Sequence, residues 1–96
     1  RKVDFVGRYG GEEFVILLPS TGLKDSVKFG DKLRSMIENF KFIYKNERIK
    51  VTISSGIATR SANLSETMTL EAADKMLYLS KENGRNQVMP KIIEEK

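Results

Sequence analysis

Two adjacent glycines, Gly10 and Gly11, limit how this chain can fold more than any other feature. Glycine takes positive φ without steric cost, so a Gly-Gly pair between apolar segments is typical of a tight chain reversal. The apolar run 14–18 predicts a strand that is buried on both faces. The residues before the glycines predict its partner, which gives a β-hairpin with Glu12 and Glu13 at its tip. Taken alone, this tip is also compatible with two solvated glutamates.

The chain has 96 residues, of which 40% are hydrophobic, and this suits one small globular domain. No apolar run approaches the length needed to cross a bilayer, and the first residues do not resemble a signal peptide. The net charge of +4 is compatible with an anionic small molecule but is not the clustered basic stripe of a nucleic-acid-binding protein. We therefore expect no nucleic-acid partner, and membrane association only through segments upstream of this chain.

Cysteine and histidine are both absent from the sequence. Their absence excludes disulfides, thiol nucleophiles, imidazole acid–base catalysis and the usual zinc sites. Any chemistry must use carboxylates, Lys, Arg or hydroxyls, with or without a hard cation. The lack of cysteine is also consistent with a cytoplasmic location.

Hydrophobic periodicity predicts a first helix over residues 24–39. A short strand over 42–44 and a hairpin turn over 45–48 follow. Residues 49–59 then alternate between large apolar and small side chains, which predicts another strand. Gly56 lies on the small-residue face, where a helix or a ligand can pack closely, and a helix is the simpler interpretation.

A second helix is predicted over residues 70–83, with Thr69 as its N-cap and Gly84 just beyond its end. Residues 86–89 predict a short final strand. The order of elements predicts an α+β fold, with a ferredoxin-like or nucleotidyl-cyclase-like, largely antiparallel sheet and helices packed on it. Because the sequence opens inside a strand pattern, we expect the sheet to be incomplete and the chain to be a fragment of a domain.

Two cations, Lys81 and Arg85, stand at the end of the second predicted helix. A basic residue followed by glycine is an ordinary helix ending, stabilised by the helix dipole. The functional alternative is that both cations bind a triphosphate. The chain has no P-loop, so bound phosphates would be held by side chains and a metal. Of the two tip carboxylates, Glu12 is the better candidate ligand, and it supplies half of a typical Mg²⁺ site.

The segment Arg8-Tyr9-Gly10-Gly11-Glu12-Glu13-Phe14 resembles the signature of the GGDEF-domain family, the diguanylate cyclases, in its GGEEF form. Three later segments resemble other family motifs in order and spacing: Val51-Thr52-x-Ser54-x-Gly56-x-Ala58, Ala73-Asp74 with Leu77-Tyr78, and Lys81-x-x-Gly84-Arg85-Asn86. The resemblance covers nearly all of this chain but only about the C-terminal half of the family domain. We therefore expect residues 1–90 to be the C-terminal portion of a GGDEF domain and 91–96 to be a charged tail.

Members of this family condense two GTP into cyclic di-GMP and release pyrophosphate. The resemblance implies that Glu12 is the ligand of Mg²⁺ or Mn²⁺ and the base near the attacking ribose 3′-hydroxyl. It implies that Gly10 and Gly11 lie against the nucleotide. It also implies that Lys81 and Arg85 contact the terminal phosphates.

The remaining signature residue, Glu13, is assigned by the same resemblance to substrate binding. Arg1 and Asp4 stand at the family's distance upstream of Gly10 for the product-inhibition site, although a surface ion pair is the usual meaning of such spacing. If these two residues act alone, the protein is instead a non-catalytic cyclic di-GMP sensor.

The family's second metal-binding carboxylate and its guanine-binding residues fall outside this chain. The resemblance therefore implies that the fragment alone is inactive. It also implies that the parent works as a homodimer, because two GTP-loaded domains must face each other. For the fragment itself we expect oligomerisation or strand exchange, because the sheet would have exposed edges and an uncovered apolar face.

Overall fold

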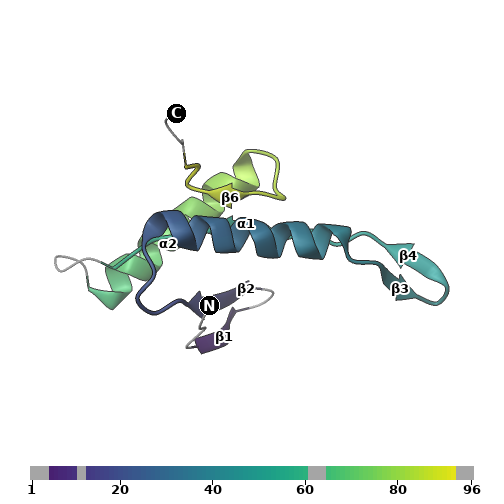
Figure 1. Cartoon of the computed structure of the whole chain (residues 1–96), viewed down its shortest axis with the longest axis horizontal. Helices are drawn as coiled ribbons and strands as arrows, with labels where there is room; N and C mark the ends of the chain where they lie inside the picture. Colours follow the sequence, from purple (N-terminus) through teal and green to yellow (C-terminus); the bar gives the residue numbers. More distant parts are fainter. Residues whose placement is uncertain (1–4, 11–12, 61–64, 93–96) are drawn as a thin grey trace.

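The computed structural model describes residues 5–10, 13–60 and 65–92. Their fold is a mixture of helices and strands, which confirms the predicted α+β class (Figure 1). The elements in chain order are β1 (Phe5–Gly10), β2 (Glu13–Leu17), α1 (Leu23–Asn39), β3 (Phe42–Tyr44), β4 (Glu47–Ile49), β5 (Ser55–Gly56), α2 (Glu66–Glu82) and β6 (Val88–Met89).

The described strands form three separate two-stranded sheets rather than one continuous sheet. The pairs β1–β2 and β3–β4 are antiparallel hairpins, whereas β5 and β6 are parallel. The strand predicted over 49–59 is therefore mostly wrong, because β4 ends at Ile49 and only Ser55–Gly56 pairs again. A ladder needs a neighbouring strand, and within the described residues β6 provides one for these two residues alone.

The β3–β4 hairpin turns through two residues, Lys45 and Asn46, with φ values of 51° and 66°. Positive φ at both central positions matches the twist of the flanking strands. The turn is shorter than the predicted 45–48, because Glu47 already pairs with Tyr44.

The helix α1 agrees with its predicted range to within one residue, but α2 begins earlier than predicted. Its N-cap is Ser65 rather than Thr69, and the Ser65 hydroxyl accepts a 3.1 Å hydrogen bond from the backbone N–H of Met68. Thr69 instead lies inside the helix and donates its hydroxyl to the Ser65 carbonyl at 2.9 Å. Both residue types suit an N-cap, so local sequence did not distinguish the two starts.

Two glycines allow the helices to approach β5 and β6 closely. A Cβ on Gly56 would collide with the α2 backbone at Ala73 and Leu77. This close approach confirms the interpretation that a helix packs on the small-residue face. A Cβ on Gly30 of α1 would lie 2.9 Å from the side chain of Ile57. Ile57 follows Gly56 directly, so α1 and α2 pack on opposite faces of this short sheet.

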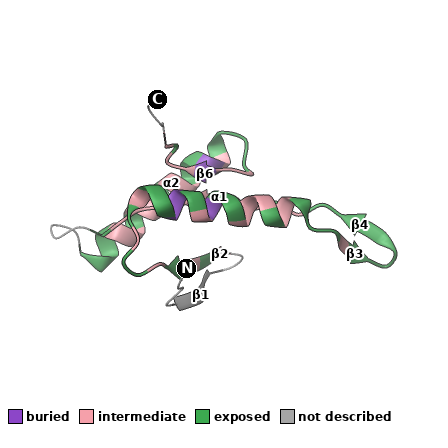
Figure 2. Ribbon diagram, in the orientation of Figure 1, coloured by how far each residue is buried: buried purple, intermediate pink, exposed green. Residues whose placement is uncertain are grey.

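Within the described residues, the buried apolar side chains are Val27 of α1 and Val88 of β6 (Figure 2). The predicted burial of the run 14–18 is wrong in this structure: Phe14 is 66% exposed and Leu17 is 52% exposed. The described residues place no layer over the β1–β2 hairpin, and burial requires one. The uncovered apolar surface agrees with the expectation of an incomplete domain.

Candidate functional site

The β1–β2 hairpin carries the signature residues. Arg8 pairs with Phe14, but the next pair joins Gly10 to Glu13, so the register shifts just before the tip. Such an irregularity re-aims the chain at the end of a hairpin. Of the predicted site residues, Gly11 and Glu12 at the tip lie outside the described part of the chain. Arg1 and Asp4 also lie outside it.

An ion pair joins the signature hairpin to the last helix. The ammonium group of Lys81 lies 3.4 Å from Oε2 of Glu13, and the two side chains are 34% and 35% exposed. The structure therefore brings together two predicted substrate-binding residues from distant segments. Pairs this exposed are screened by solvent and contribute at most about 1 kcal/mol. The pair therefore matters more for where Lys81 points than for stability.

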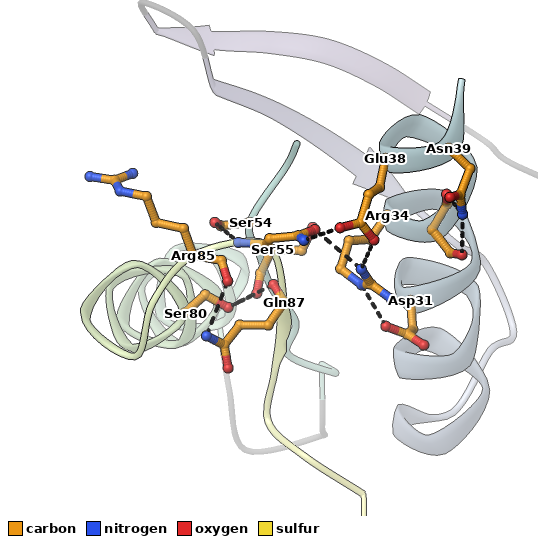
Figure 3. A network of polar contacts seen from close by, with 11 residues as sticks. Asp31, Arg34, Glu38, Asn39, Ser54, Ser55, Ser80, Arg85 and Gln87 are labelled. Carbon is orange, nitrogen blue, oxygen red and sulfur yellow. Dashed lines mark hydrogen bonds and ion pairs between the residues drawn. The ribbon is translucent and has the colours of Figure 1, made fainter. Parts of the chain in front are cut away.

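The turn from α2 to β6 carries Arg85. Gly84 has φ 107° just beyond the helix, as predicted for the residue after the helix end. The N–H of Arg85 donates to the Ser80 carbonyl at 2.9 Å, which closes the helix end. Arg85 and Asn86 also have positive φ, 62° and 47°, and such conformations cost on the order of 1 kcal/mol each. The Arg85 side chain is exposed and points away from this turn (Figure 3).

A polar network on α1 reaches the same turn. Arg34 donates to Asp31 at 2.8 Å, to Glu38 at 3.1 Å and to the side-chain carbonyl of Asn86 at 3.1 Å. The amide of Asn86 donates to the second oxygen of Glu38 at 2.6 Å. Asn86, Glu38 and Arg34 thus form a closed triangle of hydrogen bonds between α1 and the turn.

The contacts of Glu38 and Arg34 favour the charged forms of both groups. The hydrogen bond from Asn86 is the main cause that lowers the pKa of Glu38 below its ordinary value of 4.5, and Arg34 and Lys50 contribute further. The hydrogen bond to Asp31 is the main cause that raises the pKa of Arg34. Both groups are therefore fully charged at neutral pH.

The sequence did not predict the roles of Arg34 and Glu38. Their spacing of four residues on one helix is a visible signal for an ion pair. The link to Asn86, however, depends on packing between segments far apart in the chain. Asn86 itself was quoted only as part of a motif, without a role.

Ser80 of α2 has a structural role in holding the helix to the short β5–β6 sheet. Its side chain is fully buried, and its hydroxyl lies 2.7 Å from the carbonyl of Ser55 and 3.0 Å from that of Gln87. The single hydroxyl proton can be donated to either carbonyl. Ser80 therefore ties α2 to β5 and to the residue just before β6 (Figure 3).

The described residues do not by themselves make a metal site. No group of three or more Asp or Glu among them lies close enough together to hold a metal ion. The described carboxylate nearest in sequence to the predicted ligand Glu12 is Glu13, which faces Lys81. In the same part of the chain, neither helix is long and apolar enough to span a bilayer.

The chain was compared with known proteins. The family model described as "Diguanylate cyclase, GGDEF domain" matches residues 1–87. Diguanylate cyclase A of Treponema denticola is 38% identical over 89 residues, which is 92% of this chain and 24% of that protein. Diguanylate cyclase DgcP of Pseudomonas aeruginosa is 39% identical over 88 residues, which is 92% of this chain and 13% of that protein. The chain thus spans about a quarter or less of the length of these relatives.

A solved structure agrees with these matches. The GGDEF domain of DgcB from Caulobacter crescentus, in complex with c-di-GMP, superposes with a TM-score of 0.82 at 34% identity. The superposition covers 88% of this chain and 51% of that one. The fold of the described residues is therefore that of about half of such a domain.

Proposed function

This chain belongs to the GGDEF-domain family, and from that premise we propose that its parent protein condenses two GTP molecules into cyclic di-GMP. The observation that best supports this proposal is the ion pair of Lys81 with Glu13. It sets a cation of the last helix beside the hairpin that carries the signature. A nucleotide lying against that hairpin would have its phosphates within reach of this cation.

The residues divide into three roles. Gly10 and Gly11 carry no side chains, so a nucleotide can lie against the hairpin backbone. Lys81 and Arg85 bind the terminal phosphates, and their charges stabilise the departing pyrophosphate. Glu13 orients Lys81 until the phosphates arrive.

Glu12 is the proposed base for the ribose 3′-hydroxyl. The 3′-oxygen attacks the α-phosphorus of the second GTP, its proton passes to the Glu12 carboxylate, and the bond to pyrophosphate breaks. Repeating the step in the other direction closes the ring and releases a second pyrophosphate. Such phosphoryl transfer depends on positioning and electrostatics, so a chain without histidine or cysteine can perform it.

Mg²⁺ or Mn²⁺ is the proposed cofactor, with Glu12 as one ligand. A bound divalent cation would neutralise phosphate charge. The described residues provide no cluster of three acidic groups, so further ligands must come from other parts of the domain or from the substrate. We propose accordingly that the 96-residue chain alone is inactive.

Assembly and location form part of the same proposal. The parent acts as a homodimer, because two GTP-loaded sites must face each other for the reaction. Arg1 and Asp4 form a regulatory site for the product. The reaction takes place in the cytoplasm, where GTP is available, and residues 91–96 remain a predicted tail beyond the catalytic domain.

The experiment that tests this function uses the full-length parent with GTP and Mg²⁺. Cyclic di-GMP is measured for the unaltered protein, for Glu12→Ala and for Glu71→Gln, which changes an exposed glutamate on α2. We expect product from the unaltered protein and from Glu71→Gln, and none from Glu12→Ala. An unchanged rate in Glu12→Ala would overturn the assignment. A parent that binds cyclic di-GMP through Arg1 but makes none would favour the sensor function.

A further inference from the structure

The turn between α2 and β6 holds two consecutive non-glycine residues in the left-handed region, Arg85 and Asn86, directly after Gly84. Residues with a Cβ disfavour this region, so an isolated chain seldom keeps such a run. Such conformations persist only where surrounding contacts fix them, and they concentrate at functional sites. The contacts that fix this turn therefore bear on what Arg85 can do.

Three hydrogen bonds to backbone groups of Arg85 and Asn86 hold the turn in place. The N–H of Arg85 donates to the Ser80 carbonyl at 2.9 Å, and the N–H of Asn86 donates to the Ser54 hydroxyl at 3.0 Å. The side-chain amide of Gln87 (Nε2) donates to the Arg85 backbone carbonyl at 3.2 Å. The guanidinium of Arg85 points away from all of these bonds (Figure 3). The backbone of Arg85 is thus anchored while its charge is presented outward.

The side chain of Asn86 is held at both ends. Its Nδ2 donates to Glu38 at 2.6 Å, and its Oδ1 accepts from Arg34 at 3.1 Å. Glu38 and Arg34 are themselves paired at 3.1 Å on successive turns of α1. Hydrogen bonds to ionised partners are the stronger kind, and here one charge of each sign fixes the orientation of a single amide.

We propose that Asn86, Glu38 and Arg34 are positioning residues that keep Arg85 aimed at the terminal phosphates of GTP. The proposal rests on the proposed function, in which Arg85 binds those phosphates. Without the triangle, the strained turn relaxes and the guanidinium is in the binding geometry for less of the time. A displacement of this kind weakens binding of the phosphates without removing any group that touches them.

The test uses two variants of the full-length parent. Glu38→Gln keeps the shape of the side chain and removes its charge. Asn86→Gly removes the amide but tolerates the left-handed backbone, so neither change forces the turn to unfold. We expect each to raise the KM for GTP about tenfold, with kcat changed less than about threefold and the domain still fully folded at the assay temperature.

The matched control for Asn86→Gly is Asn46→Gly. Asn46 also has a left-handed φ, 66°, and lies exposed in the β3–β4 turn away from the network. It therefore receives the same chemical change at a similar backbone conformation. We expect its KM to equal that of the unaltered protein. An equal rise in both variants would overturn the proposal, because loss of an asparagine in any turn would then have the same effect.

Arg85→Ala separates a positioning role from a purely structural one. If the triangle acts through Arg85, then Arg85→Ala raises the KM and adding Glu38→Gln causes no further rise. A further tenfold rise in the double variant overturns the positioning role. If Arg85→Ala raises the KM while the Glu38 and Asn86 variants do not, the positioning proposal fails and the phosphate-binding role stands. If Arg85→Ala leaves the KM unchanged, the positioning proposal and the phosphate-binding role of Arg85 are both overturned.

Discussion

The ammonium of Lys81 lies 3.4 Å from the Glu13 carboxylate, so the end of the last helix is joined directly to the signature hairpin. No other ion pair among the described residues links β2 to α2. The pair connects the segment proposed to receive the nucleotide with the segment proposed to hold its phosphates. The energy of this ion pair can be measured directly.

The Glu13–Lys81 pair should contribute little to stability. A double-mutant cycle with Glu13→Gln and Lys81→Met, measured by urea unfolding of the domain in the parent, should give a coupling free energy below about 1 kcal/mol. The coupling should fall further in 1 M NaCl, because salt screens exposed charges. A coupling above 2 kcal/mol that is insensitive to salt would show that the pair is a structural anchor rather than a readily broken contact.

Gly56 should be intolerant of any side chain. Its Cβ position is occupied by the backbone of α2 at Ala73 and Leu77, which cannot rotate out of the way. We expect Gly56→Ala to lower the free energy of unfolding by about 3 kcal/mol or more. The matched control is Gly22→Ala, since a Cβ there meets no atom within 4 Å. Equal urea midpoints for the two variants would contradict the close packing of α2 on β5.

The Glu38 triangle should make stability depend on acid pH. The folded-state pKa of Glu38 lies below its ordinary value of 4.5, so the unfolded chain binds the proton more readily. Its stabilising contribution is therefore complete above about pH 5 and is lost as the pH falls through the lowered pKa. The difference in urea midpoint between the unaltered protein and Glu38→Gln should be constant from pH 7 to 5 and shrink below pH 4.5. A midpoint difference that grows on acidification would mean that folding raises the pKa of Glu38, and it would contradict the lowered pKa.

The 96-residue chain should self-associate when it is isolated. Large apolar side chains on its described surface are open to water, including Phe14 at 66%, Phe40 at 61% and Ile43 at 66% exposure. Large apolar side chains left open to water favour association. Light scattering over a concentration series should show a mass above that of the monomer. A monomer at all concentrations would contradict this expectation.

Local signals in the sequence were sufficient to predict much of the fold. Helical periodicity gave the extent of α1, and Gly84 was identified correctly as the residue beyond α2. The small face around Gly56 correctly indicated a packed helix. Each of these features depends on residues that are close together in the chain.

Features that depend on distant partners were missed. The apolar run 14–18 looked buried because its composition is that of a core strand, but burial requires a covering layer that the described residues do not supply. The contact of Arg34 with Asn86 joins residues 52 positions apart, and no local sequence pattern predicts it. For the candidate site, the sequence motif predicted Lys81 and Arg85. The contacts that hold them, with Glu13 and Ser80, are seen only in the structure.

The most direct test of the central proposal is the stoichiometry of the reaction of the full-length parent with GTP and Mg²⁺. Nucleotide products are separated by chromatography and pyrophosphate is measured in the same samples, for the unaltered protein and for Lys81→Met. We predict two pyrophosphates for each cyclic di-GMP, and a KM for GTP about tenfold higher in Lys81→Met. Pyrophosphate release without cyclic di-GMP, or a KM unaffected by the loss of Lys81, would contradict it.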